Sequence, residues 1–251
     1  MNYALLELVN RDYNGVLTYG LPEQEVTPTG LPQLDAIIGG GIPRGRIVEI
    51  HGPEDSGKTA LALCLARQLP GPMLYVDADH GLSPYILRGM EGYLLDAGTM
   101  ENTLDACITA AGSGTFSSIV IDSVAALPTN DEIGCGISNW SYVQRERQAK
   151  VMSKALPILA PVLHHTGCTL ILVNQLREKP GMMYGNPERP TGGKAMGYYA
   201  SLRLDVRRVQ AIKAGESVTG QVIRVQVEKC KYSAPGKSAK VRLIYGEGLT
   251  A

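Results

Sequence analysis

The sequence predicts an α/β fold with a mostly parallel central sheet, flanked by helices, and an antiparallel extension at the C-terminal end. Up to about residue 200, short apolar runs bounded by Gly or Pro alternate with Ala- and Leu-rich helical segments, a pattern typical of buried parallel strands. Beyond this point polar and apolar residues alternate, which is typical of antiparallel strands with one wet face. The 251 residues suit one large domain, or one domain with a small appendage.

The first predicted elements are a helix at Tyr3–Val9 and a strand at Val16–Tyr19, followed by a Pro- and Gly-rich connector with one helical turn at 35–38. Buried strands are expected at Ile47–Ile50, Met73–Val76, Ser118–Ile121 and Thr169–Val173. Helices are expected at Thr59–Leu69, 83–90, Glu101–Ala111 and Tyr142–His165, the last bent or broken by Pro157 and Pro161. Alternating strands are expected at Ser201–Val209, Gln221–Cys230 and Lys240–Tyr245.

The formal net charge of +0 conceals an asymmetry along the chain. Residues 177–245 hold 14 Lys and Arg but 5 Asp and Glu, so this segment carries +9 and the remainder −9. Either the segment binds a polyanion or its charges lie on solvated strand faces. The five cysteines are odd in number and widely spaced, which fits a reducing cytoplasm, and no apolar run approaches the length of a membrane span.

The strongest motif is a phosphate-binding loop. Residues 52–59 match G-x-x-x-x-G-K-[ST] in full, directly after a predicted strand and directly before a predicted helix. Backbone N–H groups of such a loop surround the phosphates of ATP, Lys58 reaches the β- and γ-phosphates, and Thr59 ligates Mg²⁺. Asp122, at the end of the buried apolar run Ser118–Ile121, is expected to hold the same Mg²⁺ through water. The expected ATP-binding residues of the loop are Gly52, Pro53, Glu54, Asp55, Ser56, Gly57, Lys58 and Thr59.

Two further strands end in polar side chains at the same expected sheet edge. Asp79 follows the strand at 73–76 and can orient a water against the γ-phosphate; the alternative is a helix cap or a surface acid. Gln175 follows the strand at 169–173, and its amide can sense the γ-phosphate and relay that state to the next loop.

The segment 176–194 is expected to be a long loop without helix or strand, and such loops are usually functional. Its basic residues, glycines and single aromatic residue suit single-stranded nucleic acid, although a plain surface loop would look similar. A second loop at 131–141 contains the only tryptophan, Trp140, which would contact bases or pack at a subunit interface.

These residues together resemble the ATPase core of the RecA recombinase family, from about Val26 to Leu249. The stretches that carry the resemblance are GRIVEIHGPEDSGKT, VDADHGLSP, IVIDSVAALP, LILVNQLREKPGMMYGNPERPTGGKA, YYASLRLDVRR and VEKCKYSAP with IYGEGL. The resemblance implies an ATP- and Mg²⁺-dependent helical filament on single-stranded DNA that pairs it with homologous double-stranded DNA and exchanges strands.

The resemblance also implies roles for individual residues. Lys229 and Lys231 would reach the ATP of the neighbouring subunit, and Tyr245 would contact adenine; without the resemblance, the two lysines read as a solvated strand face. Residues 1–25 would dock on the adjacent subunit, and residues 26–251 would form the ATPase core. The implied DNA-binding residues are Arg177, Lys179, Met182, Tyr184, Gly185, Asn186, Arg189, Thr191, Gly192, Gly193, Lys194 and Trp140.

The sequence departs from the family pattern in three places. Asp79 stands where the family usually has Glu, which predicts slow hydrolysis or altered coupling to DNA with ATP binding kept. The chain stops at Ala251, where the family's C-terminal domain would follow. The first DNA loop (134–140) differs from the usual sequence, and Lys194 stands where an amide is common. These departures leave an alternative, a RecA-like regulatory or accessory ATPase that does not exchange strands.

Overall fold

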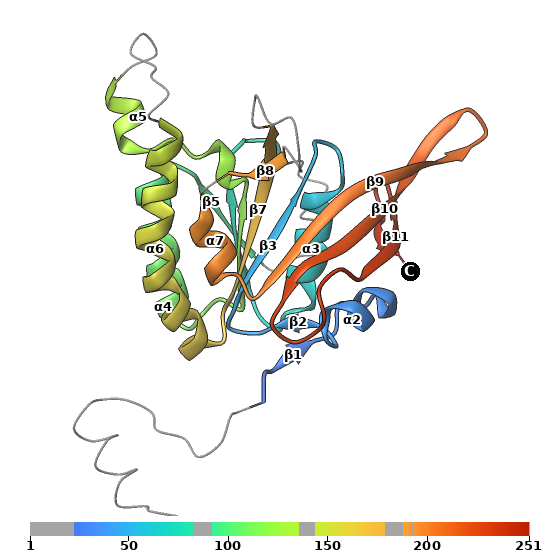
Figure 1. The fold of residues 1–251 in the computed structure, drawn as a ribbon, viewed down its shortest axis with the longest axis horizontal. Coiled ribbons are helices and arrows are strands. Elements are labelled where there is room, and N and C mark those ends of the chain that lie inside the picture. Colours follow the sequence, from blue (N-terminus) through green and yellow to red (C-terminus); the bar gives the residue numbers. More distant parts are fainter. Residues whose placement is uncertain (1–22, 83–91, 136–143, 179–187, 192, 251) are drawn as a thin grey trace, which may run out of the picture.

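The computed structural model describes residues 23–82, 92–135, 144–178, 188–191 and 193–250, and the structural statements below concern these residues. The elements predicted at 3–9, 16–19 and 83–90 lie outside them. The predicted fold class is confirmed: a large, mostly parallel sheet lies between helices and continues into antiparallel strands (Figure 1).

The main sheet contains ten of the described strands, in the order β12-β11-β10-β9-β3-β7-β6-β4-β5, with β8 paired to β7. Pairing is parallel from β9 through β5 and antiparallel from β12 through β9. A separate small sheet pairs β1 (Val26–Thr27) with β2 (Ile42–Pro43). The strands of the main sheet are β3 (Ile47–Gly52), β4 (Met73–Asp77), β5 (Gly92–Asp96), β6 (Ser118–Asp122), β7 (Thr169–Glu178), β8 (Glu188–Pro190), β9 (Leu202–Ala214), β10 (Ser217–Cys230), β11 (Ser238–Ile244) and β12 (Gly248–Thr250).

Helices cover both faces of the sheet, and each face has its own hydrophobic core. Alternate residues of β7 show the division, because Ile171 and Val173 belong to the core with α2 and α3, whereas Leu170 and Leu172 belong to the core with α4, α6 and α7. Burial on both faces explains why most residues of the inner parallel strands β3, β4, β6 and β7 are apolar. The helices are α2 (Pro32–Ile38), α3 (Lys58–Gln68), α4 (Met100–Gly112), the short 3₁₀ helix η1 (Val124–Ala126), α5 (Asn130–Cys135), α6 (Gln144–Thr166) and α7 (Lys194–Tyr199).

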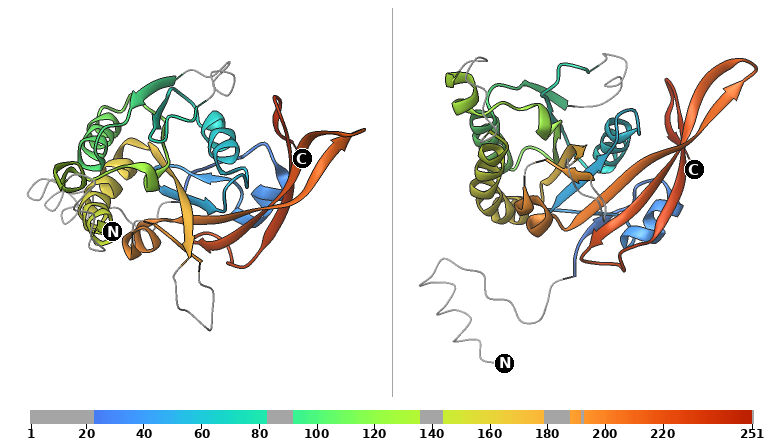
Figure 2. Two further views of the ribbon diagram at one scale, coloured as in Figure 1. Left: turned by 90° about the horizontal axis from the view of Figure 1, so that it is seen from above. Right: turned by 45° about the horizontal axis from the view of Figure 1, so that its top comes forward.

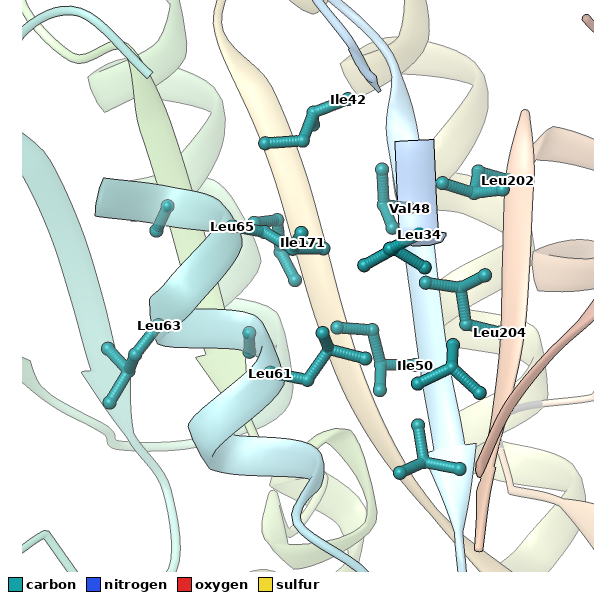
Figure 3. Packing of buried hydrophobic residues seen from close by; sticks show 14 of the residues in the cluster. Leu34, Ile42, Val48, Ile50, Leu61, Leu63, Leu65, Ile171, Leu202 and Leu204 are labelled. Carbon is teal, nitrogen blue, oxygen red and sulfur yellow. The ribbon is translucent and has the colours of Figure 1, made fainter. Parts of the chain in front are cut away.

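Helix α3 carries the phosphate-binding loop at its start and is anchored by the first of these cores. Leu61 lies near Ile50 of β3, and Leu65 lies beside Ile171 of β7 (Figure 3). All four side chains are completely buried. This packing fixes the beginning of α3 relative to the ends of β3 and β7.

Three expectations about the elements need correction. Helix α6 is continuous through Pro157 and Pro161, so these residues do not break it. Both prolines are exposed, while Leu156, Leu159 and Leu163 pack into the core, so the backbone groups that lose a partner face water. The segment after Gln175 was expected to be a plain loop, but β7 continues to Glu178 and pairs with β8. The second expected loop, at 131–141, begins in helix α5.

The antiparallel extension was predicted well but is longer than expected. Strands β9 and β10 form a hairpin that projects well beyond the helical layers (Figure 2). Its register shifts at three places, one of them between Val227 and Lys229. A register shift of this kind turns the strand locally and redirects the side chains next to it, here near the predicted interface lysines.

Candidate functional site

The phosphate-binding loop connects the end of β3 to the start of α3, as the sequence predicted. Gly57 has φ = 92°, a conformation that favours glycine. At Gly52 an added Cβ would lie 2.1 Å from the carbonyl oxygen of Val206, so a side chain is excluded there as well. From β10, the amide Nε2 of Gln221 donates to the carbonyl oxygen of Asp55 at 3.0 Å and braces the loop.

The loop offers donors that fit a phosphate group. The Ser56 hydroxyl is buried and finds no hydrogen-bond partner among the described residues. The Lys58 ammonium donates to the carbonyl oxygen of Pro53 at 2.6 Å and thus lies over the loop. Burial lowers the pKa of Lys58, against the opposing effect of the carboxylates of Asp122, Asp55 and Glu54. A bound phosphate would form a charge-assisted hydrogen bond with the Lys58 ammonium and so offset the cost of burying its charge.

Thr59 and Asp122, the two predicted magnesium ligands, are in direct contact. The Thr59 hydroxyl donates to Oδ2 of Asp122 at 2.6 Å, and the Tyr75 hydroxyl donates to the same oxygen at 3.0 Å. Burial raises the pKa of Asp122, while these two hydrogen bonds act in the opposite direction. Hydroxyl and carboxylate oxygens are the ligands that Mg²⁺ prefers, so this pair fits the ion.

Two other predicted side chains lie at the same sheet edge. Asp77 is paired in register with Asp122, and Asp79, two residues later, is close enough to help raise the pKa of Asp122. Asp79 Oδ1 accepts a hydrogen bond from the backbone N–H of Gly81 at 3.1 Å. The Gln175 amide lies 3.5 Å from the hydroxyl of Ser123, the residue after Asp122. The structure therefore brings together the phosphate loop, Asp122, Asp79 and Gln175.

A buried polar network beside the loop was not predicted from the sequence. Glu49 of β3 is completely buried; it accepts from Arg203 Nε at 2.5 Å and from the Asn174 amide at 3.1 Å. Arg203 also pairs with Glu228 at 3.2 Å, and Glu228 contacts His51 Nε2 at 3.2 Å. A carboxylate inside the apolar run Ile47–Ile50 was the available sequence signal, because such a charge needs a partner.

This network extends to the start and end of the predicted DNA loop. Asn174 donates to the carbonyl oxygen of Thr191 at 2.8 Å and accepts from its hydroxyl. Arg177 and Arg189 are register partners on β7 and β8, and Gly193 and Lys194 lead into α7, with Lys194 exposed. The remaining predicted DNA contacts lie outside the described residues: Lys179, Met182, Tyr184, Gly185, Asn186, Gly192 and Trp140.

The two predicted interface lysines lie apart from the phosphate loop of their own subunit. Lys229 Nζ donates to the carbonyl oxygens of Gly197 at 2.7 Å and Tyr198 at 3.0 Å, at the end of α7. Lys231 lines a cavity of about 450 Å³ together with Arg46, Ile47 and Tyr198. Ile47 begins β3, whereas the phosphate loop follows the end of that strand, roughly 16 Å away at the usual rise per residue.

Tyr245, the predicted adenine contact, lies at the end of β11. It follows β11, with its side chain 52% exposed and its backbone N–H bonded to the Thr219 carbonyl at 2.9 Å. Two residues earlier, Leu243 is the closest neighbour that a Cβ at Gly57 would meet, at 3.3 Å. The Tyr245 ring is thus exposed two residues beyond a side chain that packs against the loop.

Within the described part of the chain, helices long and apolar enough to cross a membrane are absent. The same residues contain no group of three or more His, Cys, Asp and Glu side chains arranged to hold a metal. The hydroxyl–carboxylate pair of Thr59 and Asp122 is a different arrangement, to which a bound phosphate would add further oxygen ligands.

A strand–loop–helix unit with this phosphate loop, in a parallel sheet where β7 separates β3 from the strand that ends in Asp122, defines the class of phosphate-loop nucleotide-binding proteins. Comparison with known proteins identifies the family within that class. The RecA N-terminal domain family matches residues 16–250, and the chain belongs to the RecA family.

Three relatives, each named Protein RecA, illustrate the similarity. The protein of Salinispora tropica is 45% identical over 238 residues, 91% of this chain and 67% of the relative. That of Bifidobacterium longum is 46% identical over 240 residues, 91% of this chain and 60% of the relative. That of Clostridium perfringens is 40% identical over 240 residues, 92% of this chain and 67% of the relative. The chain thus spans about three fifths to two thirds of these relatives.

Proposed function

We propose that this protein is a DNA-dependent ATPase that forms a helical filament on single-stranded DNA and promotes homologous pairing and strand exchange in recombinational DNA repair. Membership of the RecA family supports a role in recombination and the use of ATP and Mg²⁺. The observation that carries the proposal is the contact between Thr59 and Asp122 beside a complete phosphate-binding loop. The free thiols of the five cysteines favour a cytoplasmic protein.

The loop residues 52–59 would bind the phosphates of ATP through backbone N–H groups, with Lys58 on the β- and γ-phosphates and Tyr245 against adenine. Thr59 and Asp122 would hold Mg²⁺, which neutralises phosphate charge when bound. Asp79 would accept a hydrogen bond from the attacking water and so orient it. The Gln175 side chain, which lies next to Ser123, would contact the γ-phosphate when it is present. The resulting change in its position would be transmitted along β7 to the DNA loop.

Lys229 and Lys231 would act on the ATP of the adjacent subunit. Lys231 lies at the end of β3 opposite to the loop of its own subunit, which supports a role across an interface. Two cations placed against the γ-phosphate would stabilise the charge that develops during hydrolysis. Residues 1–25 would complete this interface by docking on the neighbouring core, formed by residues 26–251.

The DNA loop at 176–194 would bind single-stranded DNA through its phosphates, and the pairing of Arg177 with Arg189 in the register of β7 and β8 supports this. This predicts that Arg177→Ala/Lys194→Ala loses ATP-dependent, cooperative binding of single-stranded DNA in a gel-shift assay. The double variant Lys150→Ala/Lys154→Ala removes the same charge from exposed positions of α6 and should bind normally. Normal binding by the loop variant would refute the assignment of this loop.

One observation favours a second candidate, a RecA-like regulatory or accessory ATPase without strand exchange. The Asp79 carboxylate is bonded to the N–H of Gly81, within its own turn. A carboxylate held there activates water less well, and such a protein would bind ATP with slow turnover. The two candidates differ in strand exchange between a single strand and a homologous duplex, which the second does not promote.

A further inference from the structure

Tyr75 places a hydroxyl group at the proposed magnesium site. It lies in β4, is 2% exposed, and is paired in register with Val120 of β6. Its neighbours in the strand are apolar, so a phenyl ring would suit the packing equally well. A buried tyrosine hydroxyl needs a hydrogen-bond partner, and here the partner is Oδ2 of Asp122, at 3.0 Å.

Oδ2 of Asp122 accepts two hydroxyl hydrogen bonds, one from Thr59 of α3 and one from Tyr75 of β4. Two donors occupy the two lone pairs of one carboxylate oxygen, which leaves Oδ1 as the acceptor for an ion or its bound water. Thr59 donates its proton to Asp122 and therefore keeps its own lone pairs for the ion. Rotation of the carboxylate would break both hydrogen bonds, so the donors fix its orientation from two different elements.

We propose that Tyr75 is a positioning residue of the magnesium site, whose hydroxyl holds the Asp122 carboxylate in the orientation that receives Mg²⁺ with ATP. The inference rests on the proposed ATP and Mg²⁺ site. Groups that orient a metal ligand by hydrogen bonding contribute about 10- to 100-fold to metal affinity. A merely structural hydroxyl would instead stabilise the fold equally with and without Mg²⁺, so the two roles predict different measurements.

The test is binding of a fluorescent ATP analogue to the full chain across a Mg²⁺ titration and in EDTA. In Tyr75→Phe, the Mg²⁺ concentration at half-saturation should rise about tenfold, while the affinity for the analogue in EDTA should stay unchanged. Tyr93→Phe is the matched control, since Tyr93 lies on the neighbouring strand β5 with an exposed side chain, and it should behave as wild type. Tyr75→Met, which also lacks the hydroxyl and adapts to irregular packing, should show the same rise.

An unchanged Mg²⁺ requirement in Tyr75→Phe would overturn the proposal. A loss of affinity of equal size in Mg²⁺ and in EDTA would also overturn it, as would failure of both variants to give a cooperative thermal melt in EDTA, since the hydroxyl would then be structural. If wild-type protein binds the analogue no better with Mg²⁺ than in EDTA, the proposed Mg²⁺-ATP site itself is wrong. If wild type responds to Mg²⁺ and Tyr75→Phe responds identically, only the role of Tyr75 is wrong.

Discussion

At the residue scale, the proposed ATP hydrolysis makes its most direct demand on Asp79, the proposed water-orienting residue. Its carboxylate reaches the N–H of Gly81 in its own turn, and one further methylene would carry it closer to the site of the attacking water. We therefore predict that Asp79→Glu raises the steady-state rate of ATP hydrolysis, whereas the control Asp79→Asn lowers it. A tenfold fall in the hydrolysis rate of Asp79→Glu, about 1.4 kcal/mol in the activation barrier, would mean that the geometry of the site requires the shorter side chain of aspartate.

Glu228 gives a prediction about pH. Its hydrogen bond from His51 lowers its pKa in the folded protein, and the nearby Arg203 acts in the same direction. A carboxylate with a lowered folded pKa contributes stability above its unfolded pKa, and this is lost as the pH falls through the folded value. Glu228→Gln should therefore reduce the free energy of unfolding at neutral pH.

Urea titrations at a series of pH values measure this effect. The difference in the free energy of unfolding between wild type and Glu228→Gln should disappear as the pH is lowered. Added salt should reduce this difference, because Glu228 is partly exposed. Glu216→Gln, in the exposed turn between β9 and β10, is the control and should show no such difference. A difference that does not vary with pH would contradict the assigned cause.

The residues of the phosphate loop and Asp122 could be found from sequence, because their signals are local: a fixed spacing, and an acid directly after an apolar run. Tyr75 and the pair Glu49–Arg203 could not, since their partners are 47 and 154 residues away along the chain. Nothing in the run 73–76 distinguishes a tyrosine that packs from one that also donates to Asp122. Contacts across a sheet depend on strand order and register, which local patterns do not specify.

At the element scale, strand β3 depends on the partners of Glu49. Its carboxylate is completely buried and bonded to Arg203 and Asn174. Removing one member of a buried ion pair costs about 3–5 kcal/mol, and the lower end of this range is expected here because Arg203 keeps its contact with Glu228. We predict a loss of that size in the free energy of unfolding for Glu49→Ala, measured by urea denaturation. Glu25→Ala, which removes a surface partner of Arg44, should change the free energy of unfolding little. A loss of equal size in Glu25→Ala and Glu49→Ala would contradict a special role for the buried ion pair.

The helices and strands of the core were predictable where both periodicity and flanking residues agree, as in β3, α3, β4 and β6. The predicted bend or break of α6 at Pro157 and Pro161 was wrong, because both prolines lie on the exposed face of the helix, where water can bond the backbone groups that lose a partner. Strand β5 was missed, since its apolar run of Tyr93–Leu95 is too short to predict a strand by itself, and the strand forms at the sheet edge by pairing with β4. The extension of β7 arises from its pairing with β8, a contact that the loop-like composition of 176–194 conceals.

At the scale of the whole molecule, parallel strands explain why the predicted site residues meet. Strands β3, β4, β6 and β7 run in one direction, so their carboxyl ends lie at one edge, with the phosphate loop, Asp79, Asp122 and Gln175. The cavity beside Lys231 includes the beginning of β3, at the opposite edge. This division gives one subunit two different faces, as a head-to-tail filament requires.

The central claim is that nucleotide turnover at this edge is coupled to DNA. The measurement that tests it most directly is the rate of ATP hydrolysis with and without single-stranded DNA, for wild type and for Lys58→Ala. We predict strong stimulation by DNA in wild type and loss of hydrolysis in Lys58→Ala, because Lys58 would contact the phosphates that react in the proposed site. ATP binding without any stimulation by DNA would contradict the claim and favour the regulatory ATPase.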